Sequence, residues 1–294
     1  GTPVVFCHGF PELAYSWRHQ LPAVAAAGFC AFAPDLRGYG ETDRPGAVET
    51  YDMHHLCADL AGLLDHYGFE KAIFAGHDWG GALVWMMPRL YPKRVAGIIG
   101  LNTPHRPRPP VDPTIIMRER FGADMYMLQF QEPGYAERIL EADVARTLRY
   151  FFRRSGGTKS GIDPELQKRL ALLAALQTSE NLWGGAPLLP PEELNVFVRA
   201  FERTGFTGGL NWYRNLSRNW QTTANIPERI EVPCLMVMGE HDFVLPPSAA
   251  DGMEKLCPHL EKYLVKNCGH WTQQEHPEEV NRVLTGWLKR HFAN

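Results

Sequence analysis

Gly76-His77-Asp78-Trp79-Gly80-Gly81 is the stretch that decides the fold of this chain of 294 residues. A short apolar run, Ala72 to Gly76, precedes its turn and predicts a buried strand, whereas the apolar spacing from Trp79 to Tyr91 predicts a helix. The small residues at positions 76, 80 and 81 permit a turn so tight that the residue at its centre is strained. The stretch therefore predicts a strand, a sharp turn and a helix, with Asp78 displayed at the turn.

Similar strands and helices alternate outward from this turn in both directions. Such alternation predicts a mostly parallel α/β sheet with helices on both faces. The predicted buried strands are Pro3–Cys7, Cys30–Pro34, Ala72–Gly76, Ala96–Leu101, Cys234–Gly239 and Lys262–Lys266. The predicted helices are Trp17–Ala27, Met53–Tyr67, Trp79–Tyr91, Pro247–Leu256 and Pro277–Arg290.

Residues 105–225 break the alternation. This stretch is helical and aromatic, it contains no convincing buried strand, and several prolines mark its beginning. An insertion that leaves a sheet between two strands and returns to the same edge most naturally forms a cap over that edge. We therefore expect an α/β core of residues 1–104 and 226–294, with residues 105–225 as a helical lid.

The composition excludes several functional classes. Thirty basic and 33 acidic side chains give a net charge of -3, so no strong field attracts nucleic acid or an anionic membrane. No apolar run reaches the ~18 residues of a membrane span, and no secretory signal is visible at the start. The six cysteines are scattered and form no Cys-x-x-Cys pair, so we expect reduced thiols and a cytoplasmic protein. We expect no metal, because no cluster with metal-ligand spacing occurs.

The residue at the turn determines the chemistry. The pattern is that of a nucleophile elbow, but its central residue is Asp78 and not a serine. A carboxylate can displace a leaving group from an sp³ carbon and form an ester of its own side chain, which an activated water must then hydrolyse. The alternative is an aspartate that only caps the following helix. The glycines on both sides of Asp78 favour the nucleophile.

A base and an orienting acid are expected at later strand ends. Asp242 follows the strand Cys234–Gly239, and His270 follows the last strand. The order Asp78, Asp242, His270 is the order of nucleophile, acid and histidine in the α/β-hydrolase fold. His270 would take a proton from water while Asp242 holds its tautomer. Glu240 is a rival for the acid, but Asp242 lies further into the loop.

The first strand ends at His8-Gly9-Phe10-Pro11-Glu12. In hydrolase folds a turn of this kind supplies one backbone N–H of the oxyanion hole, and the residue after the nucleophile supplies the other. We therefore expect the N–H groups of Phe10 and Trp79 to stabilise the oxyanion that forms when the Asp78 ester is hydrolysed. Phe10 could equally line the cleft.

Seven motifs together resemble the soluble epoxide hydrolases, especially the C-terminal hydrolase domain of the animal enzyme. They are His8-Gly9-Phe10-Pro11-Glu12, Asp35-Leu36-Arg37-Gly38-Tyr39-Gly40, Gly76-His77-Asp78-Trp79-Gly80-Gly81, Gln131-Glu132-Pro133-Gly134, Asn211-Trp212-Tyr213-Arg214-Asn215, Asp242-Phe243-Val244-Leu245 and Cys268-Gly269-His270-Trp271-Thr272-Gln273. The resemblance covers essentially the whole chain. It implies an α/β-hydrolase fold and hydrolysis of epoxides to vicinal diols without a cofactor. It also implies a possible homodimer, because the animal relatives are dimers.

The resemblance further implies two lid tyrosines that bind and protonate the epoxide oxygen. They are Tyr126, five residues before the Gln-Glu-Pro-Gly motif, and Tyr213 of the Asn-Trp-Tyr-Arg motif. A phenol with a pKa near 10 is a protonated donor at neutral pH. The expected substrate pocket is lined by Phe10, Trp79, Tyr126, Tyr213 and Trp271. An aromatic lid suits lipophilic epoxides, either of fatty acids or of xenobiotics.

The chain departs from this family at both ends. It starts almost at the strand that leads into His8, so the first two strands of the family's sheet are expected to be missing. We likewise expect neither a phosphatase domain before the hydrolase core nor a peroxisomal tripeptide at the C-terminus. These departures affect the edge of the sheet and leave the expected site residues in place.

Two other functions remain open at this stage. A dehalogenase would share the aspartate at the elbow, but a halide leaves without a proton and has no use for two phenols. Many dehalogenases also place the acid after the strand that here ends at Asn102, and an asparagine cannot be that carboxylate. A binding protein that has lost catalysis would show at least one broken position, and every expected position is intact.

Overall fold

The computed structural model describes residues 1–154 and 171–293, which form two compact units. The first unit comprises Gly1–Leu36, Met53–Pro107 and Ile226–Asn294, and the second comprises Arg37–Asp52 and Arg108–Asn225. Residues 155–170, which the sequence analysis assigned to the lid, lie outside the described residues.

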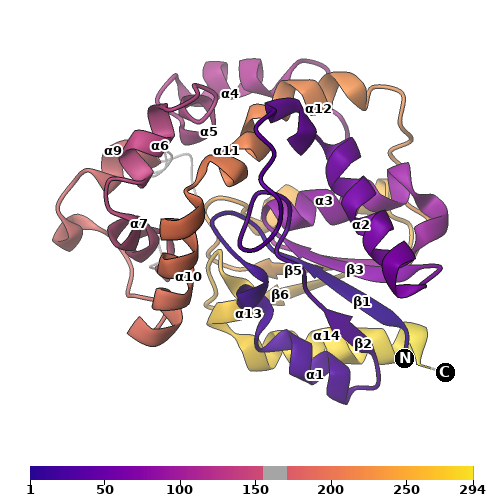
Figure 1. Cartoon of the computed structure of the whole chain (residues 1–294). Helices are drawn as coiled ribbons and strands as arrows, with labels where there is room; N and C mark the ends of the chain where they lie inside the picture. The colour runs from indigo at the N-terminus through magenta and orange to yellow at the C-terminus, as the bar shows by residue number, and fades with distance from the viewer. Residues whose placement is uncertain (155–170, 294) are drawn as a thin grey trace. The chain divides into compact units, whose positions relative to one another are not determined.

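A parallel sheet forms the centre of the first unit (Figure 1). In the described part of the chain it has six strands in the order β2-β1-β3-β4-β5-β6, and every neighbouring pair is parallel. The strands are β1 (Pro3–Cys7), β2 (Cys30–Phe32), β3 (Ala72–His77), β4 (Val95–Leu101), β5 (Cys234–Gly239) and β6 (Leu260–Val265). The four central strands are almost entirely buried, as expected for a parallel sheet covered on both faces.

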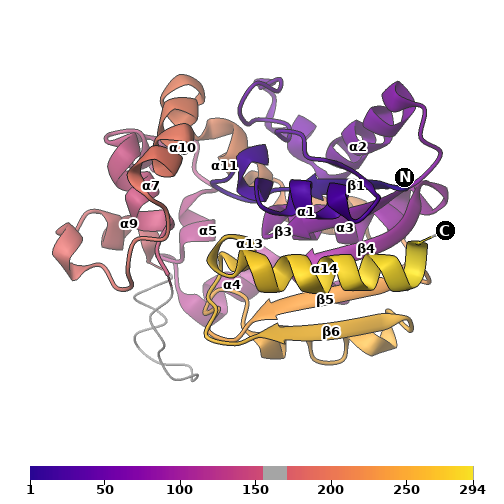
Figure 2. The same ribbon diagram turned by 90° about the horizontal axis from the view of Figure 1, so that it is seen from below.

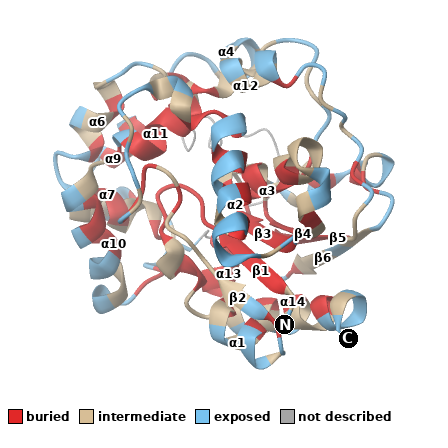
Figure 3. Cartoon of the chain, turned by 45° about the vertical axis from the view of Figure 1, so that its right-hand side comes forward, coloured by how far each residue is buried: buried red, intermediate tan, exposed pale blue. Residues whose placement is uncertain are grey.

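Helices cover the two faces of this sheet. Helices α1 and α14 pack together on one face, and α2 and α3 pack together on the other (Figures 1 and 2). The larger helices and short helical turns of this unit are η1 (Ala14–Trp17), α1 (Gln20–Ala26), α2 (Met53–Tyr67), α3 (Trp79–Leu90), η3 (Pro92–Arg94), η5 (Pro247–Ala250), η6 (Met253–Lys255), α13 (Thr272–Glu275) and α14 (Pro277–Phe292). Figure 3 shows the strands buried and the outer side of α2 exposed.

The hydrophobic core of this unit follows from the two periodicities of its elements. Alternate residues of the strands, such as Phe6 of β1 and Leu101 of β4, point to the face that carries α14 and pack there with Trp287. Helix α2 buries one residue in every three or four, including Leu60 and Leu64, and therefore presents one apolar stripe to the sheet.

The regular elements in the described part of the second unit are helices and short helical turns, apart from one isolated bridge between Arg153 and Pro187. Its elements are η2 (Val48–Tyr51), α4 (Pro113–Phe121), α5 (Tyr126–Gln129), α6 (Tyr135–Leu140), α7 (Val144–Phe151), α9 (Leu172–Leu176), η4 (Glu180–Leu182), α10 (Pro191–Thr204), α11 (Thr207–Arg214) and α12 (Leu216–Thr222).

Residues 37–52 belong to this helical unit, although the sequence analysis placed them with residues 1–104. Hydrogen bonds explain the difference. The indole of Trp212 donates to the carbonyl oxygen of Arg37 at 3.0 Å, and the amide of Asn215 donates to the carbonyl oxygen of Val48 at 2.7 Å. Contacts of this kind join segments that are far apart in sequence, so the local pattern carries no sign of them.

The fold class is confirmed, and most predicted elements agree with the structure to within a few residues. The predicted helix Pro247–Leu256 is wrong, since the structure has only the short 3₁₀ turns η5 and η6 there. Asp251 is extended and Gly252 has φ 80°, so the helical hydrogen bonds cannot continue through them. The predicted helix Trp17–Ala27 is likewise shorter, because η1 ends at Trp17 and α1 starts at Gln20.

Candidate active site

Asp78 occupies a strained turn between β3 and α3. Its φ of 52° and ψ of -121° are unusual for a residue with a side chain. Small neighbours make the turn possible, because a Cβ added to Gly76 would lie 2.1 Å from the carbonyl oxygen of Gly80. The hydroxyl of Thr103 donates to the Asp78 carbonyl oxygen at 2.7 Å and supports the turn. The side chain of Asp78 does not cap the helix, so the capping alternative is excluded.

A backbone N–H already faces this carboxylate. The N–H of Phe10 donates to Asp78 Oδ1 at 2.9 Å. Gly9 permits this approach, because a Cβ at that position would lie 2.6 Å from the same oxygen. The other predicted donor, the N–H of Trp79, belongs to the first residue of α3 directly after the nucleophile. The turn after β1 and the N-terminus of α3 thus both border the Asp78 carboxylate.

Asp242 and His270 meet at the ends of β5 and β6. The carboxylate oxygen Asp242 Oδ2 lies 2.8 Å from His270 Nδ1, and His270 Nε2 lies 3.7 Å from Asp78 Oδ2. The structure therefore brings the three predicted side chains together in one line. Trp271, which was predicted to line the pocket, is buried with its ring 4.9 Å from that of His270.

The acid is fully buried and surrounded by donors. The N–H groups of Val244 and Leu245 donate to Asp242 Oδ1 at 2.9 and 3.0 Å. The side-chain amide of Asn102 donates to Oδ2 at 2.7 Å. Burial would raise the pKa of Asp242, but the charge and hydrogen bond of His270, together with these donors, hold it below its usual value.

Glu240, the rival acid, is used elsewhere. Its carboxylate accepts from the backbone N–H of Asn267 at 2.9 Å and from the Lys266 ammonium at 2.9 Å. These contacts fix the turn after β6. Glu240 therefore has a structural role, and Asp242 is the acid that the histidine contacts.

The charges of the site depend on one another. Burial alone would lower the pKa of His270, but the carboxylates of Asp242 and Asp78 raise it well above its ordinary value. Burial would raise the pKa of Asp78, but the hydrogen bond and charge of His270, the charge of His77 and the N–H of Phe10 lower it. The resting site therefore holds an imidazolium between two carboxylates.

A second, fully buried ion pair lies behind Asp78, and the sequence analysis missed it. His77 Nδ1 lies 2.7 Å from Glu12 Oε2, and His77 Nε2 lies 2.7 Å from the carbonyl oxygen of His270. Glu12 also accepts from the Gly9 N–H at 3.0 Å and from the side-chain amides of Gln273 and Gln274.

These contacts determine the charge of the pair. Burial would raise the pKa of Glu12, but the charge and hydrogen bond of His77 lower it, so Glu12 is a carboxylate. A carboxylate and a carbonyl only accept, so both ring nitrogens of His77 must donate and the ring is an imidazolium. Because His77 also contacts the backbone of His270, it links the turn of Asp78 to the turn that carries His270. The features of the sequence that could have indicated this pair are the histidine next to Asp78 and the glutamate in the turn after β1.

Tyr126 and Tyr213 lie together in the second unit. Both are buried, and their ring centroids are 6.0 Å apart with the rings nearly perpendicular at 74°. Phe130 packs edge-on against each of them, at 5.4 and 5.0 Å. Residues 87 positions apart in the sequence therefore form one aromatic cluster.

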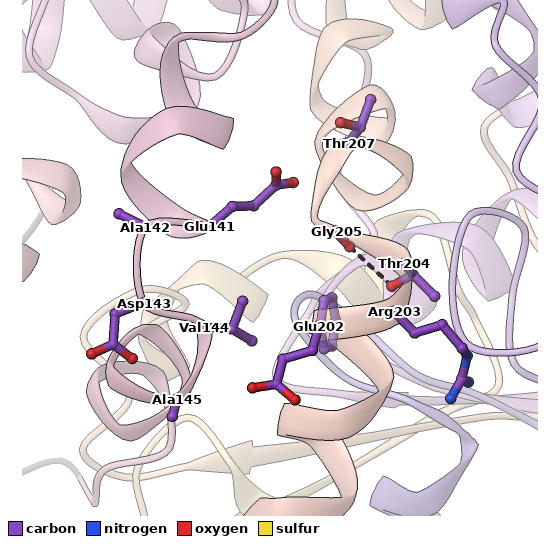
Figure 4. Close-up of a pocket in the computed structure, with 11 residues that line it drawn as sticks. Glu141, Ala142, Asp143, Val144, Ala145, Glu202, Arg203, Thr204, Gly205 and Thr207 are labelled. Carbon is purple, nitrogen blue, oxygen red and sulfur yellow. Dashed lines mark hydrogen bonds between the residues drawn. The ribbon is translucent and has the colours of Figure 1, made fainter.

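The second unit also carries a hollow of about 730 Å³ between the turn from α6 to α7 and the turn from α10 to α11 (Figure 4). Its lining is polar and includes Glu141, Asp143 and Glu202. None of the predicted site residues borders it. No group of three or more potential metal ligands occurs in residues 1–154 and 171–293, and no helix there is long and apolar enough to cross a membrane.

Comparison with known proteins agrees with this geometry. Residues 2–277 match the family described as alpha/beta hydrolase fold. The chain is 46% identical to epoxide hydrolase A of Mycobacterium tuberculosis, over 98% of this chain and 91% of that protein. It is 42% identical to bifunctional epoxide hydrolase 2 of Sus scrofa, but spans only 52% of the length of that relative.

Solved structures give the same result. The crystal structure of epoxide hydrolase A from Mycobacterium thermoresistibile superimposes with a TM-score of 0.87 at 44% identity, and the match covers 98% of this chain and 91% of that one. An epoxide hydrolase from an endophytic Streptomyces gives a TM-score of 0.88 at 38% identity, over 98% of this chain and 89% of that one. The chain therefore belongs to the epoxide hydrolases of the α/β-hydrolase fold.

Proposed function

We propose that this protein hydrolyses epoxides to vicinal diols through a covalent ester on Asp78. The observation that carries the proposal is the carboxylate at the elbow, with Phe10 N–H on one oxygen and His270 beside the other. A carboxylate in this position suits attack on an sp³ carbon. A dehalogenase would share it, but the relatives named above are epoxide hydrolases.

In the first step Asp78 Oδ2 attacks one ring carbon, and the bond from that carbon to the epoxide oxygen breaks. The oxygen leaves as an alkoxide that must be protonated. We assign this role to the phenols of Tyr126 and Tyr213, which are neutral donors at pH 7. Oδ1, which accepts from Phe10 N–H, becomes the carbonyl oxygen of the ester.

Ester formation changes the charge around His270. The resting imidazolium is stabilised by two carboxylates, and the ester removes the charge of one of them. The pKa of His270 must then fall, because part of the attraction for its proton is gone. His270 releases its proton to solvent, and the phenols regain from solvent the proton that they gave to the alkoxide. The ring is thereby neutral when a base is required.

In the second step neutral His270 takes a proton from water, and the hydroxide attacks the ester carbonyl. Negative charge develops on Oδ1, where the N–H groups of Phe10 and Trp79 stabilise it; loss of one such donor typically costs about 3 kcal/mol. The carbonyl–alkoxy bond breaks, and the diol leaves with the second proton of the water. The site returns to a carboxylate at Asp78 and an imidazolium at His270.

A single turnover in ¹⁸O-water tests the covalent route. Enzyme in excess over styrene oxide should yield an unlabelled diol and an Asp78 peptide that carries ¹⁸O, because the water oxygen enters the carboxylate. Direct attack of water on the epoxide would place ¹⁸O in the first-turnover diol, which would refute the ester. Asp78→Asn should abolish turnover, with peptide mass spectrometry as a check that the amide has not deamidated.

We also infer that the preferred substrates are lipophilic, either fatty-acid or xenobiotic epoxides. The aromatic cluster of Tyr126, Phe130 and Tyr213 supports this, since apolar ligands favour aromatic surroundings. A fatty-acid epoxide and glycidol can be compared by kcat/KM. Equal values for the two would contradict the preference.

The cellular location and the oligomeric state remain predictions. The six cysteines form no disulfide, which is compatible with the reducing cytoplasm proposed from the sequence. Cell fractionation tests the location. Sedimentation equilibrium tests the homodimer, which is implied by the resemblance to the dimeric animal enzymes.

A further inference from the structure

The two phenols of the second unit are useful together only if their separation is fixed. Both have to donate to a single oxygen, and a shift of about 1 Å in such a donor can cost on the order of 100-fold in rate. Tyr126 is the first residue of α5, a helix of only four residues. A helix this short has no stability of its own, so other contacts must hold Tyr126 in place.

Gln131 connects the two tyrosine segments directly. Its side-chain Nε2 donates to the carbonyl oxygen of Met127 at 2.8 Å and to the carbonyl oxygen of Tyr213 at 2.9 Å. Met127 directly follows Tyr126 in α5. Both hydrogens of one amide group are therefore used, one on each of the two backbones that carry the phenols.

Arg214 forms a second connection from the side of α11. Its Nε donates to the carbonyl oxygen of Phe130 at 3.0 Å, directly at the end of α5. The same guanidinium donates to both carboxylate oxygens of Glu137, at 2.8 and 2.9 Å, and to Asn211 Oδ1 at 2.9 Å. The Arg214 side chain is only 5% exposed and that of Glu137 12%. Both contacts with Glu137 come from Nη2, so the three nitrogens of the guanidinium bind three different residues, and the pair with Glu137 is shielded from solvent and from screening by salt.

Glu137 is itself fixed to the chain. Its Oε2 accepts from the backbone N–H of Gly134 at 2.9 Å, at the start of α6. The segment from Tyr126 to Glu137 is therefore joined to α11 by two sets of hydrogen bonds. Gln131 binds the Tyr213 backbone, and Arg214 binds Phe130 and Glu137. Phe130 packs edge-on against both phenol rings.

We propose that Gln131 and the Arg214–Glu137 pair are positioning residues that set the separation of the Tyr126 and Tyr213 phenols for ring opening. This inference rests on the role proposed above for the two phenols. It assigns the contacts of Gln131 to the step in which the alkoxide is protonated. Hydrolysis of the ester, which uses His270 and the backbone donors at Asp78, does not depend on them.

The test measures the two steps separately for Gln131→Met, which keeps the length of the side chain but has no donor. Rapid quench of enzyme in excess over styrene oxide, followed by mass spectrometry of the Asp78 peptide, gives the rates of ester formation and ester loss. We expect ester formation to slow by about 10- to 100-fold and ester loss to change by less than about 2-fold. Arg214→Lys, which keeps the charge but cannot bind Phe130, Asn211 and Glu137 through three separate nitrogens, should also slow the first step only.

Gln129→Met is the matched control. Gln129 lies two residues away, is half-buried, and its side chain makes no hydrogen bond within residues 1–154 and 171–293. The same substitution there should leave both rates close to wild type. If Gln129→Met is as slow as Gln131→Met, or if Gln131→Met slows both steps equally, the effect is a general disturbance and the inference is wrong.

A double variant separates positioning from other roles. In a Tyr213→Phe background the separation of two phenols no longer matters, so Gln131→Met should cost at most about 3-fold. An undiminished cost in that background would overturn the inference. Tyr126→Phe and Tyr213→Phe alone test the proposed function. If they slow ester formation while Gln131→Met does not, only the inference fails; if they do not slow it, the proposed role of the phenols fails.

Discussion

The side-chain amide of Asn102 donates to the same oxygen of Asp242 that faces His270, at a distance of 2.7 Å. Asn102 can do this because it directly follows β4 with a positive φ of 62°, and its backbone N–H donates to the carbonyl oxygen of Val237 of β5 at 2.8 Å. Asn102 has no carboxylate of its own, but its amide therefore orients the carboxylate of Asp242.

Asn102→Gly should lower kcat for styrene oxide by about 10- to 100-fold, since a hydrogen bond to a buried charged group is worth about 1.5–3 kcal/mol. Glycine accepts the positive φ, so the loss reports on the amide and not on backbone strain. Asn267→Gly is the matched control. Asn267 also has a positive φ, 51°, but is exposed, and its variant should keep kcat within about 2-fold. Wild-type kcat in Asn102→Gly would show that Asp242 does not need this donor.

Glu12→Gln should lower the free energy of unfolding. The amide has nearly the size of the carboxylate but leaves the buried His77 imidazolium without its counter-charge. Removal of one partner of a buried pair costs about 3–5 kcal/mol, which urea unfolding would detect.

Glu240→Gln provides the comparison for that experiment. Glu240 is paired with Lys266 at the surface, so its variant should unfold close to wild type. If Glu12→Gln unfolds at the wild-type urea concentration, His77 is not an imidazolium and the charge assignment is wrong.

The site residues that could be predicted are those whose positions follow from short stretches of sequence. Asp78 could be predicted at the turn because Gly76 must be small for a local steric reason: a Cβ there would lie 2.1 Å from the carbonyl oxygen of Gly80, four residues on. Asp242 and His270 were identifiable because parallel strands end at one edge of a sheet, so residues after β5 and β6 must meet there.

The residues that escaped prediction act across the fold. Asn102 was considered only as a missing carboxylate, and nothing in its neighbourhood reveals that its amide reaches Asp242, 140 positions away. The pair of Glu12 and His77 spans 65 positions. The inclusion of residues 37–52 in the helical unit depends on donors from Trp212 of α11 and from Asn215, which lies between α11 and α12. Tertiary hydrogen bonds of this kind have no periodicity that a sequence could display.

The pH dependence of stability should have two sides. Glu12, Asp78 and Asp242 have lowered pKa values in the folded protein, so their contribution is present above the unfolded values of about 4 and is lost as the pH falls below them. His270 has a raised pKa, so its contribution is present below about 6.5 and is lost as the pH rises through the folded value.

Urea unfolding from pH 3 to pH 9 measures both limbs. In Asp242→Asn one carboxylate no longer holds the proton of His270, so the folded pKa of His270 falls, and the decline on the alkaline side should be smaller and end at lower pH. Identical alkaline limbs in the wild type and in Asp242→Asn would show that His270 does not gain its proton affinity from Asp242.

Substitution of alanine for glycine should have opposite effects on stability at Gly80 and at Gly62. A Cβ at Gly80 would lie 2.1 Å from the carbonyl oxygen of Cys7 and 2.5 Å from that of His8, and backbone atoms of a central strand cannot move aside. Gly80→Ala should therefore lower the free energy of unfolding by at least about 3 kcal/mol and displace Asp78. Gly62 lies on the exposed side of α2 with nothing within 4 Å of an added Cβ, so Gly62→Ala should raise stability by about 0.5–1 kcal/mol. Urea unfolding of both variants provides the measurement. A Gly80→Ala protein as stable as wild type would mean that the elbow is not packed against the end of β1, and the geometry that strains Asp78 would need another cause.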